Sequence, residues 1–197
     1  MSIVNLVSGG LDSTLISVML KEEGIQTYPL FVNYGQICAQ REWNACLAVH
    51  QSLKLPPPKC IDISGYGKLI ISGLTNKEKD VKSDAFTPGR NLLFLIVGAA
   101  YAFQIGANAV AIGLLSEQFS LFPDQKLTFI KAAENAVQVA LNRTIRILTP
   151  LFEFNKIDVV ELASKRGISG TYSCHKGTEI PCGYCVSCLE LIGLNKN

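Results

Sequence analysis

"SIVNLVSGGLDSTL" (residues 2–15) joins an apolar, β-branched run to a glycine-containing turn and then to the start of a helical pattern. The run "SIVNLV" predicts a buried strand, because β-branched residues fit a pleated sheet. "STLISVMLKEEG" (residues 13–24) has apolar residues at helical spacing and ends on a glycine, which is typical of a helix and its C-terminal cap. The stretch therefore predicts a strand, a loop and a helix in succession.

The same alternation continues along the chain. Further strands are predicted at residues 28–34, 59–64, 107–115 and 144–151, and further helices at residues 39–55, 91–106, 127–142 and 156–167. This order favours an α/β fold with a doubly wound, mainly parallel sheet and helices on both faces. Ligands of such sheets bind beyond the carboxyl ends of the strands. Residues 64–90 lie outside the pattern and are expected to form a lid or a partly disordered loop.

Composition bounds the class of protein. The 197 residues, 48% of them hydrophobic, are enough for one main core and a small appendage, which we place at residues 1–168 and 169–197. The net charge of +2 arises from interspersed acidic and basic residues, so we expect no direct binding to nucleic acid or to an anionic membrane. The first residues lack a signal peptide and no apolar run has membrane-spanning length, which predicts a cytoplasmic protein.

The loop after the first predicted strand has the composition of a phosphate site. Ser8, Gly9 and Gly10 allow a tight turn whose backbone N–H groups face an anion, and Ser13 and Thr14 add hydroxyls at the start of a helix. Asp12 would repel phosphate unless it caps the helix or acts through Mg²⁺. The alternative is a purely structural turn in which Asp12 or Ser13 caps the helix.

Two basic residues are candidates for the same site. Lys156 stands at the start of a predicted helix, although an ordinary surface lysine is an equally good interpretation. Arg90 follows a Pro-Gly turn and precedes a strongly apolar helix, so its guanidinium group is expected to clamp a phosphate or a carboxylate. Asn91 is the expected N-cap of that helix.

Four of the seven cysteines crowd the stretch "CHKGTEIPCGYCVSC" (residues 174–188). The spacing of Cys174, Cys182, Cys185 and Cys188 predicts a closed tetrahedral shell of four thiolates, which is typical of structural zinc. An iron–sulfur cluster is the alternative with the same number of ligands. His175 could replace Cys174 as a ligand, but we expect it to point toward the active site instead.

Several of these motifs occur together in one known family. "SGGLDST" matches the pyrophosphate loop (PP-loop) of adenylating ATPases, and "FTPGRNLLFL" (residues 86–95), "FPD" (122–124), "NK" (155–156) and the cysteine tail follow it in order. The chain resembles the 7-cyano-7-deazaguanine synthase family of the queuosine precursor pathway. The resemblance implies a carbon–nitrogen ligase that adenylates 7-carboxy-7-deazaguanine with ATP and lets ammonia displace AMP to give the amide. A second ATP then activates the amide oxygen, and loss of the activated oxygen gives the nitrile.

The resemblance also assigns roles to residues. It implies zinc on the four cysteines, and ATP and Mg²⁺ in the main domain, with Asp12, Lys156 and Arg90 as the catalytic residues. Substrate contacts are expected from Gln36, Glu117, Phe119, Phe122, Asp124 and His175, and we expect a homodimer. The ATP-binding residues would be Ser8, Gly9, Gly10, Leu11, Asp12, Ser13, Thr14, Arg90, Asn91 and Lys156.

The chain departs from the family pattern on the substrate side. Ile37-Cys38 replaces the usual Arg-His, Ser116-Glu117-Gln118 replaces Glu-Thr-Asp, and Leu127 stands at a usually acidic position. These changes favour a divergent member, which either makes the nitrile, stops at the amide, or passes the activated carboxylate to another amine such as a protein N-terminus. Two other classes stay open: a tRNA sulfur transferase and a non-catalytic nucleotide-binding module.

Overall fold

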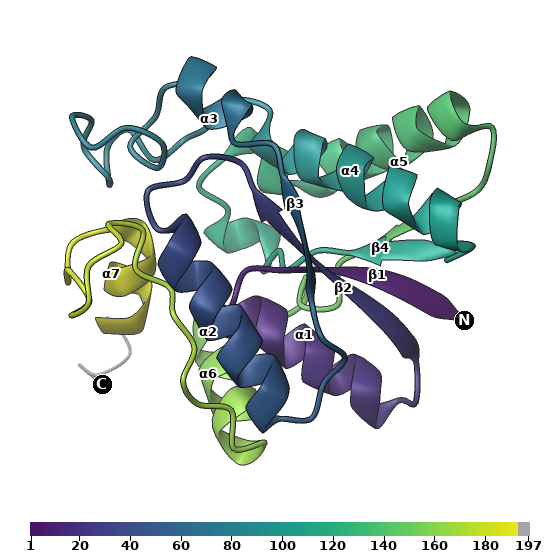
Figure 1. The fold of residues 1–197 in the computed structure, drawn as a ribbon, viewed down its shortest axis with the longest axis horizontal. Helices are drawn as coiled ribbons and strands as arrows, with labels where there is room; N and C mark the ends of the chain where they lie inside the picture. The colour runs from purple at the N-terminus through teal and green to yellow at the C-terminus, as the bar shows by residue number, and fades with distance from the viewer. Residues whose placement is uncertain (193–197) are drawn as a thin grey trace.

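The computed structural model describes residues 1–192. The sheet has five strands in the order β3-β2-β1-β4-β5, and every neighbouring pair is parallel. The predicted doubly wound α/β fold is therefore confirmed (Figure 1). The strands are Ser2–Val7 (β1), Gln26–Asn33 (β2), Lys59–Asp62 (β3), Ala109–Ala111 (β4) and Arg146–Leu148 (β5).

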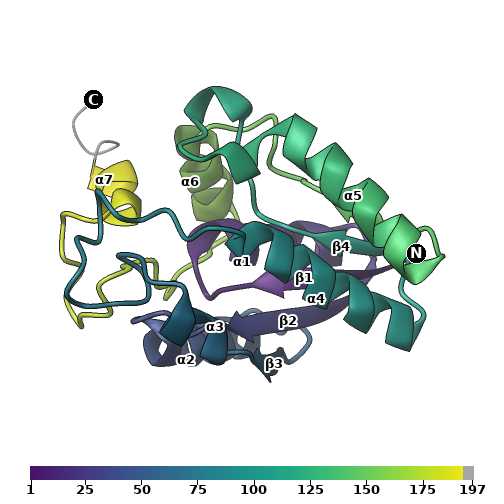
Figure 2. The ribbon, with the colours of Figure 1, turned by 90° about the horizontal axis from the view of Figure 1, so that it is seen from above.

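Helices cover both faces of this sheet. The bundle of α4 and α5 lies on one face, and α1, α2 and α6 lie on the other (Figures 1 and 2). Among residues 1–192, no helix is both long and apolar enough to cross a membrane. The helices are Leu11–Glu22 (α1), Ala39–Ser52 (α2), Gly65–Leu69 (α3), Arg90–Ile105 (α4), Leu127–Leu141 (α5), Lys156–Lys165 (α6) and Val186–Ile192 (α7), with short 3-10 turns at Glu117–Phe119 and Pro123–Gln125.

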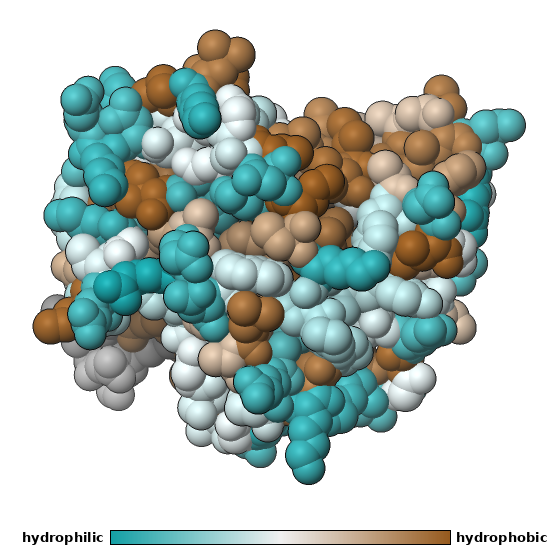
Figure 3. Space-filling view, viewed as in Figure 1, coloured by the Kyte–Doolittle hydropathy of each residue, from teal (hydrophilic) through white to brown (hydrophobic). Residues whose placement is uncertain are grey.

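The central strand β1 has apolar side chains on both faces, so both faces of the sheet must be covered by helices. Successive side chains of a strand point to opposite faces. Ile3 packs with Leu15 of α1 on one face, whereas Val4 packs with Leu95 of α4 and Val137 of α5 on the other. All five side chains are 3% exposed or less, so both faces of β1 are core. Surface apolar side chains gather over the α4 region (Figure 3), where Ile96 is 50% exposed.

Three local predictions need correction. β4 and β5 are shorter than predicted, because the chain leaves the ladder before Gly113 and Pro150, two residue types that weaken strands. Asn91 is not the N-cap of α4: Gly89, in the left-handed conformation at φ 76°, holds that place. Because a Pro-Gly turn reaches this conformation without a Cβ clash, the helix begins at Arg90, and Asn91 instead donates from Nδ2 to the Asp124 carbonyl oxygen at 3.0 Å.

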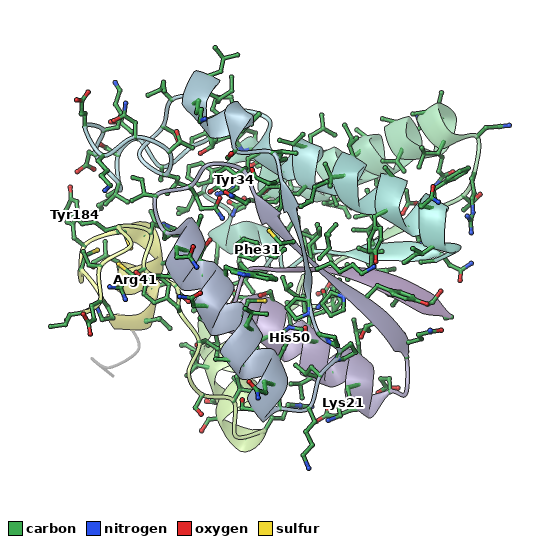
Figure 4. All side chains as sticks on the ribbon, viewed as in Figure 1. Lys21, Phe31, Tyr34, Arg41, His50 and Tyr184 are labelled. Atoms are coloured by element: carbon green, nitrogen blue, oxygen red, sulfur yellow. The ribbon has the colours of Figure 1, made fainter. Side chains whose placement is uncertain are left out.

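Residues 64–90 form α3 and a series of turns rather than a structureless loop. Their apolar side chains pack against the C-terminal part of the chain, residues 169–192, which we call the cysteine segment. The Tyr184 hydroxyl of that segment donates to Asp80 Oδ2 at 3.0 Å (Figure 4). The division at residue 168 stays a prediction, and residues 193–197 lie outside the described part. The shared cluster contains Leu74, Val81, Ala85, Cys174, Cys185 and Cys188.

Candidate active site

A cavity of about 970 Å³ lies at the carboxyl ends of the central strands. Ser8 and Gly10 line it after β1, Tyr34 after β2 and Gly113 after β4. The strand order reverses between β1 and β4. At such a point the loops after neighbouring strands diverge, and the crevice between them is where doubly wound folds bind their ligands. The cavity therefore occupies the position expected from the fold class.

The loop after β1 is folded by its own hydroxyl groups. The Ser8 backbone N–H donates to Ser13 Oγ at 3.1 Å, and the Thr14 hydroxyl donates to the Gly10 carbonyl oxygen at 2.8 Å. Gly10 is the N-cap of α1, and no side chain caps the helix, so the interpretation of Asp12 or Ser13 as a cap is wrong. The first N–H groups of α1 have no partner within the helix and are available to an anion.

Lys156 and Asp12 form an ion pair inside the cavity. Lys156 Nζ lies 2.7 and 2.9 Å from the two carboxylate oxygens of Asp12, and 3.7 Å from Glu190 Oε2 of α7. The Lys156 side chain is only 15% exposed, so it is not an ordinary surface lysine. It is the first residue of α6, whose start is fixed by reciprocal hydrogen bonds between Asn155 and Asp158.

A second group of polar side chains forms the wall near β2. Gln36 Nε2 donates to Glu42 Oε2 at 2.9 Å, and Gln36 Oε1 accepts from the Tyr34 backbone N–H at 3.0 Å. The Arg90 guanidinium group lies 6.0 Å from the centre of the Tyr34 ring. Burial raises the pKa of Glu42, although hydrogen bonds from Gln36 and Cys38 and the charge of Arg90 oppose this effect. Burial also raises the pKa of Tyr34.

His175 lines the cavity, as predicted, although it directly follows a cysteine of the cluster. Its Nδ1 is buried and has no hydrogen-bond partner among the described residues. Burial, together with the charges of Arg90 and Lys156, lowers the pKa of His175 to about 4. The imidazole is therefore neutral at physiological pH, with a buried ring nitrogen available to a ligand.

The sulfur atoms of Cys174, Cys182, Cys185 and Cys188 all lie within 4.8 Å of one another. Cys182 Sγ and Cys188 Sγ are 3.9 Å apart, and Zn–S bonds in a tetrahedron would place sulfurs roughly 3.8 Å apart. Although burial favours the thiol, hydrogen bonds from the Cys182 N–H and Thr178 lower the pKa of Cys174 to about 6. Burial raises the pKa of Cys185 and Cys188. Further thiolates in this cluster therefore need a cation, and the geometry fits zinc.

The structure brings most of the predicted site residues together. Glu117 does not line the cavity, because its carboxylate accepts a hydrogen bond from the Leu127 backbone N–H at 3.3 Å. Gly9, Thr14 and Asp124 are also not among the residues that line the cavity. The predicted residues that line the cavity are Ser8, Gly10, Leu11, Asp12, Ser13, Gln36, Arg90, Asn91, Phe119, Phe122, Lys156 and His175.

The side chains of the cavity wall that sequence reasoning missed include Tyr34, Glu42 and Glu190. Glu42 stands four residues after Cys38, the N-cap of α2, so the helical period places both on one side at the start of this helix, and this signal was available. Glu190 gave no comparable signal, because α7 is a short helix whose position depends on the cysteine cluster beside it.

Comparison with known proteins places the chain among named relatives. The profile of the family described as "Queuosine biosynthesis protein QueC" matches residues 2–192. The chain is 35% identical over 197 residues to a 7-cyano-7-deazaguanine synthase of Desulfitobacterium hafniense (strain DSM 10664 / DCB-2), covering 94% of this chain and 84% of the relative. It is also 35% identical over 206 residues to that of Nautilia profundicola, covering 98% of this chain and 93% of the relative.

Solved structures share the fold at lower identity. The NMN synthetase of Francisella tularensis superimposes with a TM-score of 0.57 and 14% sequence identity, over 91% of this chain and 68% of that one. At this identity the likeness concerns the fold alone.

Proposed function

The chain belongs to the queuosine biosynthesis protein QueC family, and we propose that it is an ATP-consuming ligase that converts 7-carboxy-7-deazaguanine and ammonia into 7-cyano-7-deazaguanine. The observation that supports this most directly is the Lys156–Asp12 pair at the mouth of the glycine loop. The adjoining cavity of about 970 Å³ has room for a nucleotide and a bicyclic substrate together.

A carboxylate is a poor electrophile, so its conversion to an amide needs a leaving group. ATP supplies this leaving group by transferring AMP to a carboxylate oxygen, with release of pyrophosphate. Lys156 and the first N–H groups of α1 would stabilise the negative charge on the phosphates. As Lys156 turns toward the phosphates, Asp12 would become available to a Mg²⁺ ion, which in nucleotide sites is held by one or two carboxylates and the phosphates themselves. Mg²⁺ would withdraw charge from the reacting phosphate.

The substrate would lie on the β2 and α4 side of the cavity. Arg90 is the cation placed to pair with the substrate carboxylate, and the unpartnered Nδ1 of His175 can bind a polar group of the ring. Phe119 and Phe122 line the cavity as well and would offer faces for stacking on a purine-like ring. Glu117 and Asp124 lie outside the wall and are not assigned a contact here.

We propose structural zinc for the cysteine cluster. Four thiolates close the coordination shell and leave no position for substrate, so the metal would stabilise the cysteine segment rather than take part in the reaction. An iron–sulfur cluster is the competing assignment, and metal analysis separates the two.

The test is incubation of the purified protein with ATP, Mg²⁺, ammonium and 7-carboxy-7-deazaguanine, followed by quantification of AMP and pyrophosphate and by mass spectrometry of the product. We expect the nitrile. Accumulation of the amide would mean that the chain stops after the first step, and a mass increase on an added peptide amine would identify a protein acceptor. Formation of no AMP with any amine would contradict the proposal.

The competing classes give different results in the same assay. A tRNA sulfur transferase would release AMP only with tRNA and a sulfur donor, and a nucleotide-binding module would bind ATP without releasing AMP. The cytoplasmic location, the homodimer and the absence of nucleic-acid binding stay predictions from the sequence. Sedimentation of the protein tests the dimer.

A further inference from the structure

Three carboxylates line the cavity within the described residues: Asp12, Glu42 and Glu190. Asp12 and Glu190 both interact with Lys156, at 2.7 and 3.7 Å. Glu42 forms no ion pair in residues 1–192, although Arg90 lies near enough for its charge to influence it. Glu42 is thus the one carboxylate of the described wall without an ion-pair partner, which makes it the candidate to receive a small cation.

Neighbouring groups hold this carboxylate in place. Gln36 is fixed by its bond from the Tyr34 backbone N–H, and its Nε2 also approaches the Val32 carbonyl oxygen at 3.4 Å. It therefore presents a fixed donor to Glu42 Oε2 at 2.9 Å. The Cys38 thiol also hydrogen-bonds to this carboxylate, but no N–H group of the described residues donates to Oε1, so Gln36 supplies the only N–H donor that Glu42 has within residues 1–192.

Glu42 also stands directly beside the phosphate loop. A Cβ atom built on Gly9 would lie 2.5 Å from the Glu42 carbonyl oxygen, so the loop and the first turn of α2 are in backbone contact. Because Glu42 also lines the cavity, a group bound by it would share the cavity with the adenylated carboxylate of the proposed function.

We propose that Glu42 binds the ammonium ion and removes one of its protons in the amide-forming step, an inference that rests on the proposed function. Ammonium predominates at neutral pH and has no lone pair with which to attack. Transfer of one proton to Glu42 gives ammonia, whose nitrogen forms a bond to the acyl carbon while the bond from that carbon to the AMP oxygen breaks. AMP leaves with the electron pair, the second proton passes to water, and Glu42 returns its proton to solvent.

The alternative role for Glu42 is recognition of the guanine-like edge of the substrate. That edge presents two parallel N–H donors and is matched by both oxygens of a carboxylate. Since Gln36 already occupies Oε2 and the Cys38 thiol also hydrogen-bonds to the carboxylate, Glu42 does not offer two vacant oxygens, and a single N–H of ammonium suits it better. The raised pKa of Glu42 also makes it a better proton acceptor than an exposed glutamate, because a base works best when its pKa is near the working pH.

The variant Glu42→Gln keeps the shape and removes the proton acceptor. We expect ATP–pyrophosphate exchange with 7-carboxy-7-deazaguanine, measured without ammonium, to stay within about twofold of wild type, and amide formation from ammonium to fall by ~10²-fold or more. Hydroxylamine is uncharged at neutral pH and needs no base, so hydroxamate formation should fall by less than about threefold. The exchange reaction also reports that the variant is folded. Glu161→Gln, an exposed residue of α6, is the matched control.

Each other outcome overturns the inference. An equal loss with ammonium and hydroxylamine would mean that Glu42 has a structural role. A raised KM for the deazapurine with an unchanged KM for ammonium would assign Glu42 to the guanine-like edge. Loss of the exchange reaction would place it in adenylation, and in that case Glu42→Asp would show whether a shorter carboxylate restores it. Wild-type protein that forms no AMP would overturn the proposed function before any variant is compared.

Discussion

At the scale of single residues, Lys156 is the cation on which the proposed adenylation depends. Its amine is held within 2.9 Å of both oxygens of Asp12, which lies in the first turn of α1 at the end of the loop after β1. Replacing it by methionine keeps the length of the side chain but removes the charge. We expect AMP release to fall by roughly 10²–10³-fold, the usual cost of losing one charge-stabilising donor in an active site.

The control for this variant is Lys165→Gln in the last turn of the same helix, where the lysine is exposed. AMP release by Lys165→Gln should match wild type. If Lys156→Met also releases AMP at the wild-type rate, Lys156 is a structural partner of Asp12, and the phosphates must be bound elsewhere in the cavity.

The buried side chain of His50 should make the free energy of unfolding depend on pH. It is 2% exposed, with Nδ1 2.7 Å from the Pro56 carbonyl oxygen and Nε2 without a partner among the described residues. Burial lowers the pKa of His50 below its unfolded value of about 6.5. The unfolded chain therefore binds more protons in mild acid, so the stability contributed above about pH 6.5 is lost as the pH falls toward the folded pKa.

This histidine alone should add up to ~1.4 kcal/mol per pH unit to the slope of the unfolding free energy. Urea unfolding at about pH 7.5 and about pH 5.5 measures that slope, and His50→Gln should reduce it. His175 contributes in the same direction, so His175→Gln is needed beside it. An unchanged slope in His50→Gln would show that His50 is not kept neutral by the fold.

The residue scale also shows where sequence reasoning fails. Lys156 was predicted as a site residue and lies in the cavity, because the phosphate loop and the start of α6 both stand at the carboxyl edge of the sheet. Glu42 was not predicted: its helical spacing from Cys38 was visible in the sequence, but its proposed role also depends on Arg90, which comes from α4 and meets it only in three dimensions. Pairwise tertiary contacts of this kind leave no local pattern.

At the scale of elements, Gly9 couples the phosphate loop to α2. It has φ 76°, and a Cβ atom there would lie 2.5 Å from the Glu42 carbonyl oxygen and 2.7 Å from the Cys46 nitrogen. Gly9→Ala combines a left-handed residue, which costs ~1–2 kcal/mol, with a clash against backbone that costs ~1–3 kcal/mol more. We expect a loss of about 3 kcal/mol in unfolding free energy together with loss of ATP binding.

Gly24→Ala is the matched control, because Gly24 has φ 65° and nothing within 4 Å of its added Cβ. This variant should lose only the conformational term, ~1–2 kcal/mol, and should bind ATP normally. Denaturant titration gives both free energies. Equal losses in the two variants would contradict a tight contact between the loop and α2.

Asn155 tests how the first turn of α6 places Lys156. Its side chain accepts from the Asp158 N–H at 3.0 Å, and Asp158 accepts from the Asn155 N–H at 2.8 Å. We expect Asn155→Ala to cost ~1 kcal/mol in unfolding free energy and to lower AMP release, whereas Asn155→Asp, which keeps a capping oxygen, should do neither. If Asn155→Ala and Asn155→Asp released AMP at the same rate, the position of Lys156 would not depend on the capping hydrogen bond.

The elements themselves were predictable where hydrophobic periodicity and a terminating residue agree. α1, α2, α5 and α6 begin within two residues of their predicted starts, because the helical pattern reports the face buried against the sheet. β4 and β5 were predicted too long, since apolar residues around Gly113 and Pro150 are buried without being paired. The turns of residues 64–90 could not be predicted, because they are ordered by packing against the cysteine segment, far along the chain.

At the scale of the whole molecule, the cysteine segment connects parts of the site that are distant in sequence. The Tyr172 N–H donates to the Gly9 carbonyl oxygen at 2.9 Å, and Glu190 reaches Lys156. Arg41 of α2 points toward the segment, donating from Nε to the Gly177 carbonyl oxygen at 2.8 Å (Figure 4). A metal in this segment would therefore stabilise the phosphate loop, α2 and Lys156 together.

Metal removal tests this connection. The cysteine segment is too short to bury a core of its own, so its structure should depend on the free energy of metal binding, which in small zinc domains reaches ~10–16 kcal/mol. We expect about one zinc per chain by elemental analysis. Stripping it with a chelator should lower the melting temperature and reduce AMP release by ~10-fold or more, because His175 and Glu190 leave the cavity wall when the segment unfolds. Added zinc should restore both.

The variant Cys185→Ser should reproduce the loss, whereas Cys60→Ser, which changes an exposed thiol outside the cluster, should not. Bound iron in place of zinc would contradict the assignment of the metal, and full AMP release by the metal-free protein would show that the cysteine segment does not support the active site.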